Sequence, residues 1–532
     1  MEKAYPIDIK GIRSIGIKEW LNNYYVPVSS SEFNDISKSA TSIYTSTLNK
    51  FNSSGIFYHL GIANYKLPDR ISQNLLNLLR LRRLREKGYM YIVGSKKESI
   101  NDVINQYEFN LLPKHTNPKT ILDKLTRKER VKNVIRSIRY NLKAESINKC
   151  FIKNINNPIF FVGDRSQKEV VGYCREENIY PIHISPLLFG KNIYSKSDIN
   201  PYMSDIHDFC SVFMDLMKKQ FEVLTTSHCK SLKDEIEELF TYSLIFFIHN
   251  VKFLSKLNNA TLLVTGLGNS IHRLFSVAWR YSGGKVIGFT HGNSFYRNYF
   301  IGNYIYLSLV DQYVTASAES AKSMQDASKD FTVNIERGEA IYTKQNHYRA
   351  LFGELQKLPH DKKINKVMLV GFPMASFYYK YIPAGYAYAH LELEIQLLRL
   401  LKSAGYQTIY KPHPFTANDT TSLLNEYADE IQNGSFEDVY HLANCILFGE
   451  FMSTTFGFAM LTNKPMVLVN VEGHIISKEA FELLKKRCCV VSAEEIEGVI
   501  SFNDNELLNA VELSLSNINY DIIHKFAFSS YG

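Results

Sequence analysis

Hydrophobic and polar positions alternate along this chain with two periods. Short apolar runs recur, and the segments between them repeat their apolar residues every three or four positions. This alternation of strand-like and helix-like patterns is typical of an α/β protein with parallel sheets. In the first part of the chain the predicted strands are 89–93, 159–162, 180–184, 261–265, 285–289 and 312–315. In the second part they are 366–370, 408–411, 445–448 and 466–470, with 489–491 as a further candidate.

The segments between these strands predict the helices and the domain boundaries. Predicted helices include 168–177, 206–224, 271–281 and 391–403. The polar stretch 351–365 interrupts the pattern, so we expect two Rossmann-like domains that are joined there. The expected bounds are 1–355, with a mainly helical elaboration over residues 1–85, and 356–505. Residues 506–532 are expected to form one or two helices that cross back to the first domain.

Composition narrows the class of protein and its setting. With 532 residues, 45% hydrophobic and 21% charged, the chain is long enough for two globular domains. Its seven cysteines form no metal-binding spacing, which favours a reducing compartment and no structural zinc. The chain begins without an apolar secretory segment, and no apolar run is long enough to cross a bilayer. We therefore expect a cytoplasmic protein.

The net charge of +8 is unevenly distributed. Between residues 114 and 153 lysine and arginine far outnumber the acidic residues, and apolar residues recur there at helical spacing. A basic amphipathic helix of this kind suits an anionic membrane surface, such as the inner face of the cytoplasmic membrane. A surface helix with a solvated charged face is an equally good explanation. No nucleic-acid-binding motif accompanies the charge, so nucleic acid is not an expected partner.

Two polar motifs follow neighbouring predicted strands in the second part of the chain. The first motif comprises Lys411, His413 and Pro414, and the second comprises Ser453, Thr454 and Thr455 at the start of a predicted helix. Parallel sheets bind ligands outside the carboxyl ends of their strands, and a helix N-terminus attracts anions. Taken singly, the motifs are typical of a solvated loop and an ordinary N-cap. Together they predict a nucleotide-phosphate site, with Glu450 and Glu472 nearby as candidates for ribose hydroxyls.

Three loops of the first part are candidates for the acceptor and the chemistry. Gly268, Asn269, His272 and Arg273 follow the strand 261–265 and are predicted to contact the acceptor. His291 and Asn293 follow the strand 285–289, and His291 is a candidate general base or phosphate contact. Asp164 follows the strand 159–162 and is a second catalytic candidate. A tight turn between strand and helix, or a helix-capping aspartate, explains these residues in structural terms.

These motifs resemble those of GT-B glycosyltransferases in bacterial capsule and lipopolysaccharide assembly. That group includes Kdo transferases and bacterial sialyl- and polysialyltransferases, and more distantly CDP-glycerol-type polyol-phosphate polymerases. The resemblance lies in Lys411-Pro412-His413-Pro414, in Ser453-Thr454-Thr455-Phe456-Gly457 with Lys464-Pro465, and in Thr290-His291-Gly292. It implies a GT-B fold, with two Rossmann-like domains whose parallel sheets face a central cleft. Residues 1–150 carry no such resemblance.

The resemblance implies a reaction and roles for the named residues. The implied reaction transfers Kdo or a related acidic sugar from a CMP-activated donor to a glycan or lipid-linked glycan, in O-antigen or capsule biosynthesis. His413 and residues 453–455 would contact the nucleotide. His291 would act on the acceptor hydroxyl, or Asp164 would serve as the nucleophile of a retaining transferase. No Asp-x-Asp motif follows a predicted strand, so we expect no metal and no cofactor besides the donor.

Other functions fit the same pattern. A transferase of the same fold that uses a CDP-polyol, or a UDP- or GDP-sugar, differs only in its donor. A two-domain sugar-nucleotide epimerase shares the architecture but needs no acceptor. A non-catalytic scaffold, attached to a membrane through the basic helix, would bind no nucleotide.

Overall fold

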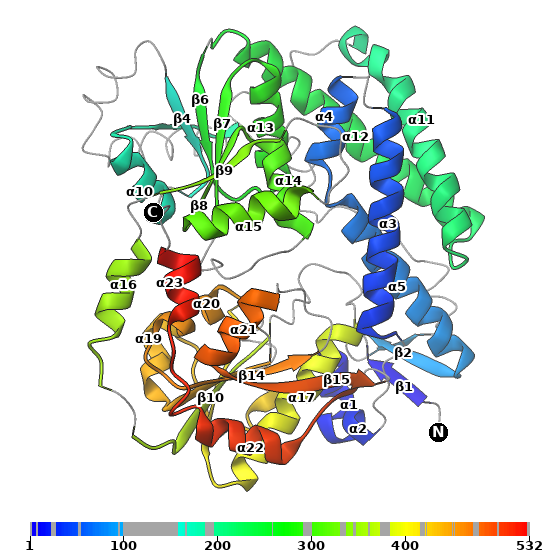
Figure 1. Ribbon diagram of the computed structural model, residues 1–532. Coiled ribbons are helices and arrows are strands. Elements are labelled where there is room, and N and C mark those ends of the chain that lie inside the picture. The colour runs from blue at the N-terminus through cyan, green and yellow to red at the C-terminus, as the bar shows by residue number, and fades with distance from the viewer. Residues whose placement is uncertain are drawn as a thin grey trace. The chain divides into compact units, whose positions relative to one another are not determined.

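The computed structural model describes most of the chain, in two compact units. The described residues are 3–6, 9–22, 28–51, 55–93, 96–98, 158–164, 168–186, 196–257, 259–290, 301–329, 337–343, 347–359, 362–372, 384–414, 421, 423–449, 451, 453–471, 478–496 and 499–528. Unit 1 combines Met1–Ser39, Arg70–Asn110 and Leu351–His524, and unit 2 combines Ala40–Asp69, Leu111–Ala350 and Lys525–Gly532. Each unit has its own large, mainly parallel sheet (Figure 1).

The main sheet of unit 1 is doubly wound. Its strands are β10 (Lys366–Val370), β11 (Gln407–Lys411), β12 (Glu430–Ile431), β13 (Cys445–Phe448), β14 (Met466–Val471), β15 (Cys489–Ile496) and β16 (Val499–Phe502). They lie in the order β12-β11-β10-β13-β14-β15-β16, parallel except for β16. The six parallel strands thus have the 3-2-1-4-5-6 order of a dinucleotide-binding sheet. The strands that follow β10 are first added on one side of it and then, from β13 onward, on the other side, so the switch point lies between β10 and β13.

The sheet of unit 2 has the other common doubly wound order. Its strands are β4 (Ile159–Val162), β5 (Ile182–His183), β6 (Thr261–Val264), β7 (Lys285–Phe289), β8 (Gln312–Thr315) and β9 (Glu339–Tyr342). They lie in the order β5-β4-β6-β7-β8-β9, and all are parallel. This is the 2-1-3-4-5 arrangement with one more strand, and its switch point lies between β4 and β6.

Helices pack around the sheets and against one another. Those within unit 1 are α1 (Ile9–Ile15), α2 (Ile17–Asn22), α17 (Ala384–Ser403), α19 (Phe436–Val439), the 3-10 helix η4 (Tyr440–Leu442), α20 (Thr454–Leu461), α21 (Lys478–Arg487) and α22 (Asp504–Leu513). Those within unit 2 are α4 (Ile56–Ala63), α10 (Lys168–Glu176), α11 (Lys196–Gln220), α12 (Thr226–Leu254), α13 (Ser270–Tyr281), α14 (Ile301–Leu309) and α15 (Ala318–Lys329). The division between the units falls inside or beside α3 (Ser30–Lys50), α5 (Leu67–Glu86), α16 (His347–Leu355) and α23 (Asp521–Phe528).

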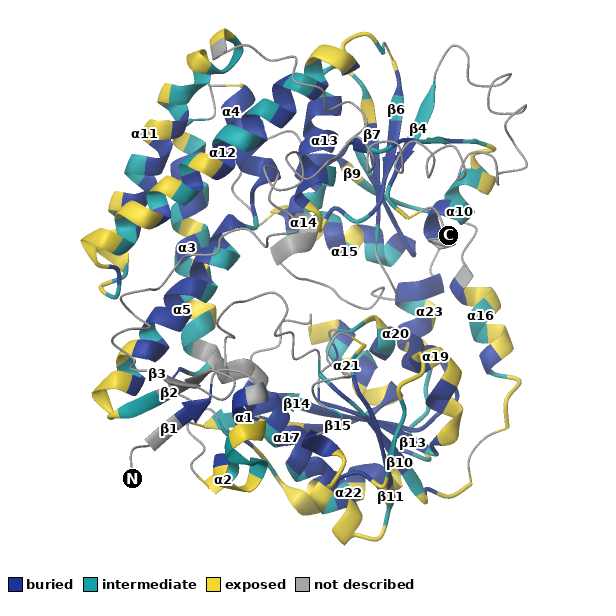
Figure 2. Cartoon of the chain, turned by 180° about the vertical axis from the view of Figure 1, so that it is seen from behind, coloured by how far each residue is buried: buried dark blue, intermediate teal, exposed yellow. Residues whose placement is uncertain are grey.

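Strand alternation decides which helix packs on which face of the sheet in unit 2. On β4, Phe161 joins a buried cluster with Val170 of α10, whereas the ring of its neighbour Phe160 lies 5.5 Å from that of Trp279 of α13. Successive side chains of a strand point to opposite faces, so α10 and α13 cover opposite sides. Figure 2 shows the central strands β6 and β7 as largely buried.

The division of the chain differs from the expected one in its N-terminal part. We expected residues 1–355 to form one domain, but residues 1–39 and 70–110 group with the C-terminal sheet. There β1 (Lys3–Pro6) pairs with β2 (Tyr89–Val93), which also pairs with β3 (Lys96–Glu98) in a separate small sheet. The Tyr388 hydroxyl of α17 donates to the Pro6 carbonyl at 2.9 Å, and Trp20 packs edge-on against the Tyr388 ring. These contacts join sequence-distant segments, which the periodicity of a single segment does not report.

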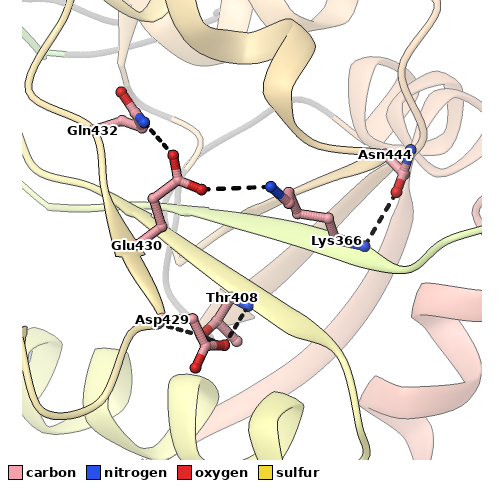
Figure 3. A network of polar contacts seen from close by, with 6 residues as sticks. All are labelled: Lys366, Thr408, Asp429, Glu430, Gln432 and Asn444. Carbon is pink, nitrogen blue, oxygen red and sulfur yellow. Dashed lines mark hydrogen bonds and ion pairs between the residues drawn. The ribbon is translucent and has the colours of Figure 1, made fainter.

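Polar contacts tie together the amino ends of the strands in unit 1 (Figure 3). At the start of β10, Lys366 donates its N–H to the Asn444 side chain at 3.1 Å, and its ammonium lies 3.4 Å from the Glu430 carboxylate. At the start of β11, the N–H and the hydroxyl of Thr408 both donate to Asp429 at 2.9 Å. The polar side chains at the amino edge of this sheet therefore contact one another. The two predicted motifs lie at the carboxyl edge.

Candidate functional site

The carboxyl end of β11 carries the first predicted motif. Lys411 is the last residue of β11 and is buried, and its ammonium donates to the Pro412 carbonyl at 2.7 Å. Pro412 is buried, His413 is half-buried, and Pro414 is exposed in a turn. The motif thus comes to the surface within three residues at the carboxyl edge of the sheet, as the sequence predicted.

Electrostatics at this strand end disfavour positive charge. Burial lowers the pKa of the Lys411 ammonium, although the charge of Glu437 opposes that shift. Burial also lowers the pKa of the His413 imidazole, and the charge of Lys411 lowers it further. An anion bound beside the two side chains would offset both effects, because an opposite charge favours the protonated forms.

The second predicted motif opens a helix after β13. Ser453 is the N-cap of α20, and its hydroxyl accepts a hydrogen bond from the Phe456 N–H at 3.1 Å. Thr454 is exposed and Thr455 is half-buried. The Phe456 ring packs edge-on against Phe448 of β13 at 4.9 Å between centroids, which fixes the first turn of α20 against the strand. The first-turn N–H groups of such a helix point toward the carboxyl edge of the sheet.

One expectation about these motifs was wrong. We expected them on neighbouring strands, but β10 lies between β11 and β13. At about 4.8 Å between adjacent strands, their ends are separated by about 10 Å. The motifs therefore flank the switch point of the sheet from both sides. A sequence orders strands along the chain and not across the sheet, so this separation was not predictable from the order of motifs.

The end of β10 is supported by a buried carboxyl group that the sequence analysis did not single out. Glu394 of α17 is 2% exposed, accepts a hydrogen bond from the Phe372 N–H at 2.6 Å, and lies 2.8 Å from the Tyr410 hydroxyl. Burial raises the pKa of Glu394 to about 8, against the lowering effect of those two hydrogen bonds. At neutral pH the carboxyl group is protonated, so the support beneath the switch point is uncharged.

The far end of α20 is held by a second residue that the sequence analysis missed. Arg487, at the end of α21, is fully buried and donates hydrogen bonds to the carbonyls of Ala459, Met460, Thr462 and Lys464 at 2.7 to 3.3 Å. Its guanidinium carbon lies 5.4 Å from the centroid of the Tyr520 ring. A cation at a helix C-terminus complements the negative end of the helix dipole. Arg487 thus fixes the helix whose other end carries Ser453.

In unit 2, one threonine connects the two strand ends at the switch point. Thr265 directly follows β6, and its N–H donates to the Val162 carbonyl of β4 at 3.0 Å. Its hydroxyl accepts a hydrogen bond from the Asp164 N–H at 2.8 Å, and its carbonyl lies 2.8 Å from Nδ1 of His272. Gly163 has a φ of 113°, and a Cβ there would collide with the Thr265 hydroxyl. Two predicted site residues, Asp164 and His272, are therefore joined through Thr265.

The loop after β6 is a tight turn that leads into α13. Gly268 and Asn269 are exposed, and the Asn269 side chain caps α13 by accepting from the Ile271 N–H at 2.9 Å. Arg273 lies behind this loop: it is 2% exposed and donates to the carbonyls of Ala63, Leu267 and Gly268. We expected Arg273 to meet a ligand. Its burial instead makes it a residue that holds the loop in shape.

Other predicted site residues lie outside the described part of the chain. These are His291, Asn293, Glu450 and Glu472, and the basic segment 114–153 lies there as well. In the residues that the structure describes, no group of three His, Cys, Asp or Glu side chains is placed to hold a metal ion. No helix among the same residues is long and apolar enough to cross a membrane.

Comparisons with known proteins give no match in sequence and a weak similarity in structure. No protein-family model matches the chain, and no curated protein matches it in sequence. Among solved structures, it is similar to a mutant of S. aureus TarM in complex with fondaparinux, alpha-GlcNAc-glycerol and UDP. The identity is 10% and the TM-score 0.30, and the match covers 53% of this chain and 54% of TarM, about half of that chain's length. The α/β class with two parallel sheets therefore rests on the strand orders themselves, which confirm it.

Proposed function

We propose that this protein is a nucleotide-sugar-dependent glycosyltransferase whose donor nucleotide binds at the carboxyl edge of unit 1. One observation supports this most directly. Lys411 and His413 on one side, and the Ser453-capped start of α20 on the other, flank the switch point of a sheet with dinucleotide-binding strand order. Such switch points hold nucleotides, and a helix start beside a lysine and a histidine suits a phosphate.

The proposed donor is a CMP-activated acidic sugar, Kdo or a sialic-acid relative. This choice is supported by the His-Pro motif and the Ser/Thr motif, which resemble those of CMP-sugar-using GT-B enzymes. The proposed acceptor is a glycan or lipid-linked glycan of a bacterial surface polysaccharide. The basic segment 114–153 would bring the enzyme to the inner face of the cytoplasmic membrane. Asp164 or His291 would act on the acceptor side.

Nucleotide binding is the first test. We expect CMP to raise the melting temperature of the purified protein, with or without EDTA, because a ligand that binds only the folded state stabilises it by about 2.7 kcal/mol at 100 times Kd. His413→Ala should abolish this shift. His441→Ala is the matched control, since His441 is an exposed histidine in η4, which leads to the amino end of β13.

Each other outcome points to a different function. A preference for CDP, UDP or GDP would keep a transferase and overturn the acidic-sugar donor. A change of the nucleotide sugar in the absence of any acceptor would favour an epimerase. Absence of a shift with all four nucleotides would overturn the proposal in favour of a non-catalytic scaffold.

A further inference from the structure

The histidine at the start of α13 has the features of a general base. His272 is half-buried in the first turn of α13, directly after the loop that ends β6. Its Nδ1 lies 2.8 Å from the Thr265 carbonyl oxygen. A carbonyl oxygen only accepts hydrogen bonds, so Nδ1 carries the proton in this contact. The neutral ring therefore has its lone pair on Nε2.

The second nitrogen is available for chemistry. Within the described residues no hydrogen bond is made to Nε2, which lies on the opposite side of the ring from Nδ1. With the proton on Nδ1, Nε2 holds an unshared pair of electrons, on a side chain that is half-buried. The backbone contact at Nδ1 fixes the tautomer and the ring orientation, as backbone carbonyls and carboxylates do for histidines in active sites.

The surroundings keep the imidazole neutral. Burial lowers the pKa of His272, while the Thr265 and Gly266 backbone contacts raise it and the Arg273 charge lowers it. In the described part of the chain, two further charged residues lie near this loop: Asp164, whose backbone N–H donates to Thr265, and Lys66, whose ammonium lies 3.7 Å from the position of a Cβ on Gly268. A base must be unprotonated at working pH, which a lowered pKa ensures.

We propose that His272 is the general base of the transfer reaction, an inference that rests on the proposed glycosyltransferase function. Nε2 takes the proton of the acceptor hydroxyl as that oxygen forms a bond to the anomeric carbon of the donor. The bond from the anomeric carbon to the phosphate oxygen breaks, and the nucleotide leaves with the electron pair. The His272 imidazolium then returns its proton to water. This single displacement inverts the anomeric centre.

Two substitutions distinguish the role of Nε2 as the base from the role of Nδ1–H as the donor to the Thr265 carbonyl. His272→Asn keeps an N–H donor for the Thr265 carbonyl but has no counterpart of Nε2. His272→Gln places an amide near the Nε2 position but leaves that carbonyl without its partner. His59→Asn is the control. Burial lowers the pKa of His59 to about 4, and its ring packs against Tyr281, about 13 Å along α13 from His272.

The expected result is a loss of kcat without a loss of donor binding. With the donor that the nucleotide screen identifies, His272→Asn and His272→Gln should lower kcat about 10²- to 10⁴-fold. The KM for the donor, the melting temperature of His272→Asn and the activity of His59→Asn should change little. In the wild type, kcat/KM should fall on the acidic side with an apparent pKa below the ordinary 6.5 of histidine, and this limb should disappear in His272→Asn.

The failures of the two proposals are distinguishable. An active wild type with His272→Asn above half of its kcat would overturn the base and leave the transferase standing. A product with a retained anomeric configuration would do the same, and would favour Asp164 as a nucleophile. A wild type that transfers no sugar from any nucleotide donor would overturn the proposed function, and the role of base with it. If His272→Asn fails to fold, the kcat of His272→Gln and the acidic limb of the wild-type kcat/KM profile test the role of His272 as the base.

Discussion

At the carboxyl edge of the sheet in unit 1, a lysine, a histidine and a serine-capped helix start surround the switch point. At the same edge in unit 2, the Thr265 hydroxyl accepts a hydrogen bond from the backbone N–H of Asp164, and the Thr265 carbonyl holds the His272 imidazole. The first arrangement suits an anion that must be held, whereas the second suits a proton that must be moved. Two sheets of related topology thus differ in the chemistry of a few loop residues, which is where α/β folds vary their function.

The two units also share a structural feature. Each has a buried arginine, Arg487 in unit 1 and Arg273 in unit 2, whose hydrogen bonds in the described residues go to backbone carbonyls. Arg487 binds the C-terminal end of a helix, whereas Arg273 binds a turn and the Ala63 carbonyl. Arg487 complements the negative end of the dipole of α20, the helix that Ser453 caps, whereas the turn held by Arg273 has no comparable dipole.

The largest effect is expected from removing these arginines. Arg487→Met and Arg273→Met should each lower the free energy of unfolding by about 3 kcal/mol or more, because buried carbonyls lose their donors. Urea denaturation of both variants measures this loss. Under conditions in which both remain folded, Arg487→Met should also weaken CMP binding about two- to tenfold, by loss of helix-end stabilisation. An equal weakening of CMP binding in Arg273→Met would contradict the proposed difference between the two arginines.

An intermediate effect is expected from Glu394 and depends on pH. Its folded-state pKa of about 8 lies above the ordinary glutamate value of 4.5. Between these values the folded protein holds a proton that the unfolded chain has lost, so the free energy of unfolding falls as pH rises through that window. Glu394→Gln keeps both partners without titrating, because its carbonyl oxygen accepts from the Phe372 N–H and its NH2 group donates to the Tyr410 hydroxyl oxygen. It should therefore be more stable than the wild type at pH 9, by about 1 to 3 kcal/mol.

Nucleotide binding gives a second readout for Glu394. Ionisation above pH 8 places a negative charge beneath the anion site, so CMP affinity of the wild type should fall there more steeply than that of Glu394→Gln. Titration of Lys411 is common to both proteins and cancels in the difference. Identical pH profiles of stability for the two proteins would show that the buried carboxyl does not titrate in this range.

The smallest effect compares the two helix caps. Ser453→Ala and Asn269→Ala each remove a side-chain acceptor from a first-turn N–H, which should cost about 1 kcal/mol in thermal or urea unfolding. Only Ser453→Ala should also weaken CMP binding in a titration, since Asn269 lies at the edge assigned to the acceptor. A loss of CMP affinity in Asn269→Ala would contradict the assignment of the nucleotide to unit 1 and of the acceptor to unit 2.

Much of the fold was predictable because strand formation is local. The strands 159–162, 285–289, 312–315, 366–370 and 445–448 have the predicted bounds. β9 (Glu339–Tyr342) was missed, since its short run is partly exposed and mixed in polarity. The helix predicted at 206–224 covers Lys196–Gln220 instead, because Pro201 lies inside its early turns without ending it. Tertiary packing overrides local propensity at such positions.

The candidate site was predictable only where a motif directly follows a strand. Lys411, His413 and Ser453 were found in this way, as were Asp164 and His272. Glu394, Arg487 and Thr265 were missed, because each acts through a partner far along the chain or through its own backbone. A charged residue within an otherwise apolar helical stretch, as at Glu394, was the one signal available. It does not reveal what the side chain contacts.

The discontinuity of unit 1 has a consequence for biosynthesis. Pro6 and its partner Tyr388 are 382 residues apart, so at about 5 to 20 residues per second the ribosome needs about 20 to 80 s between them. During that time β1 and α2 lack their contacts with α17, although the strands of unit 2 have already been synthesised. Unit 2 in turn takes up residues 525–528 only after every strand of the unit 1 sheet has been synthesised. A fragment limited to residues 356–505 would lack the segments that cover Tyr388, so the chain is best produced whole.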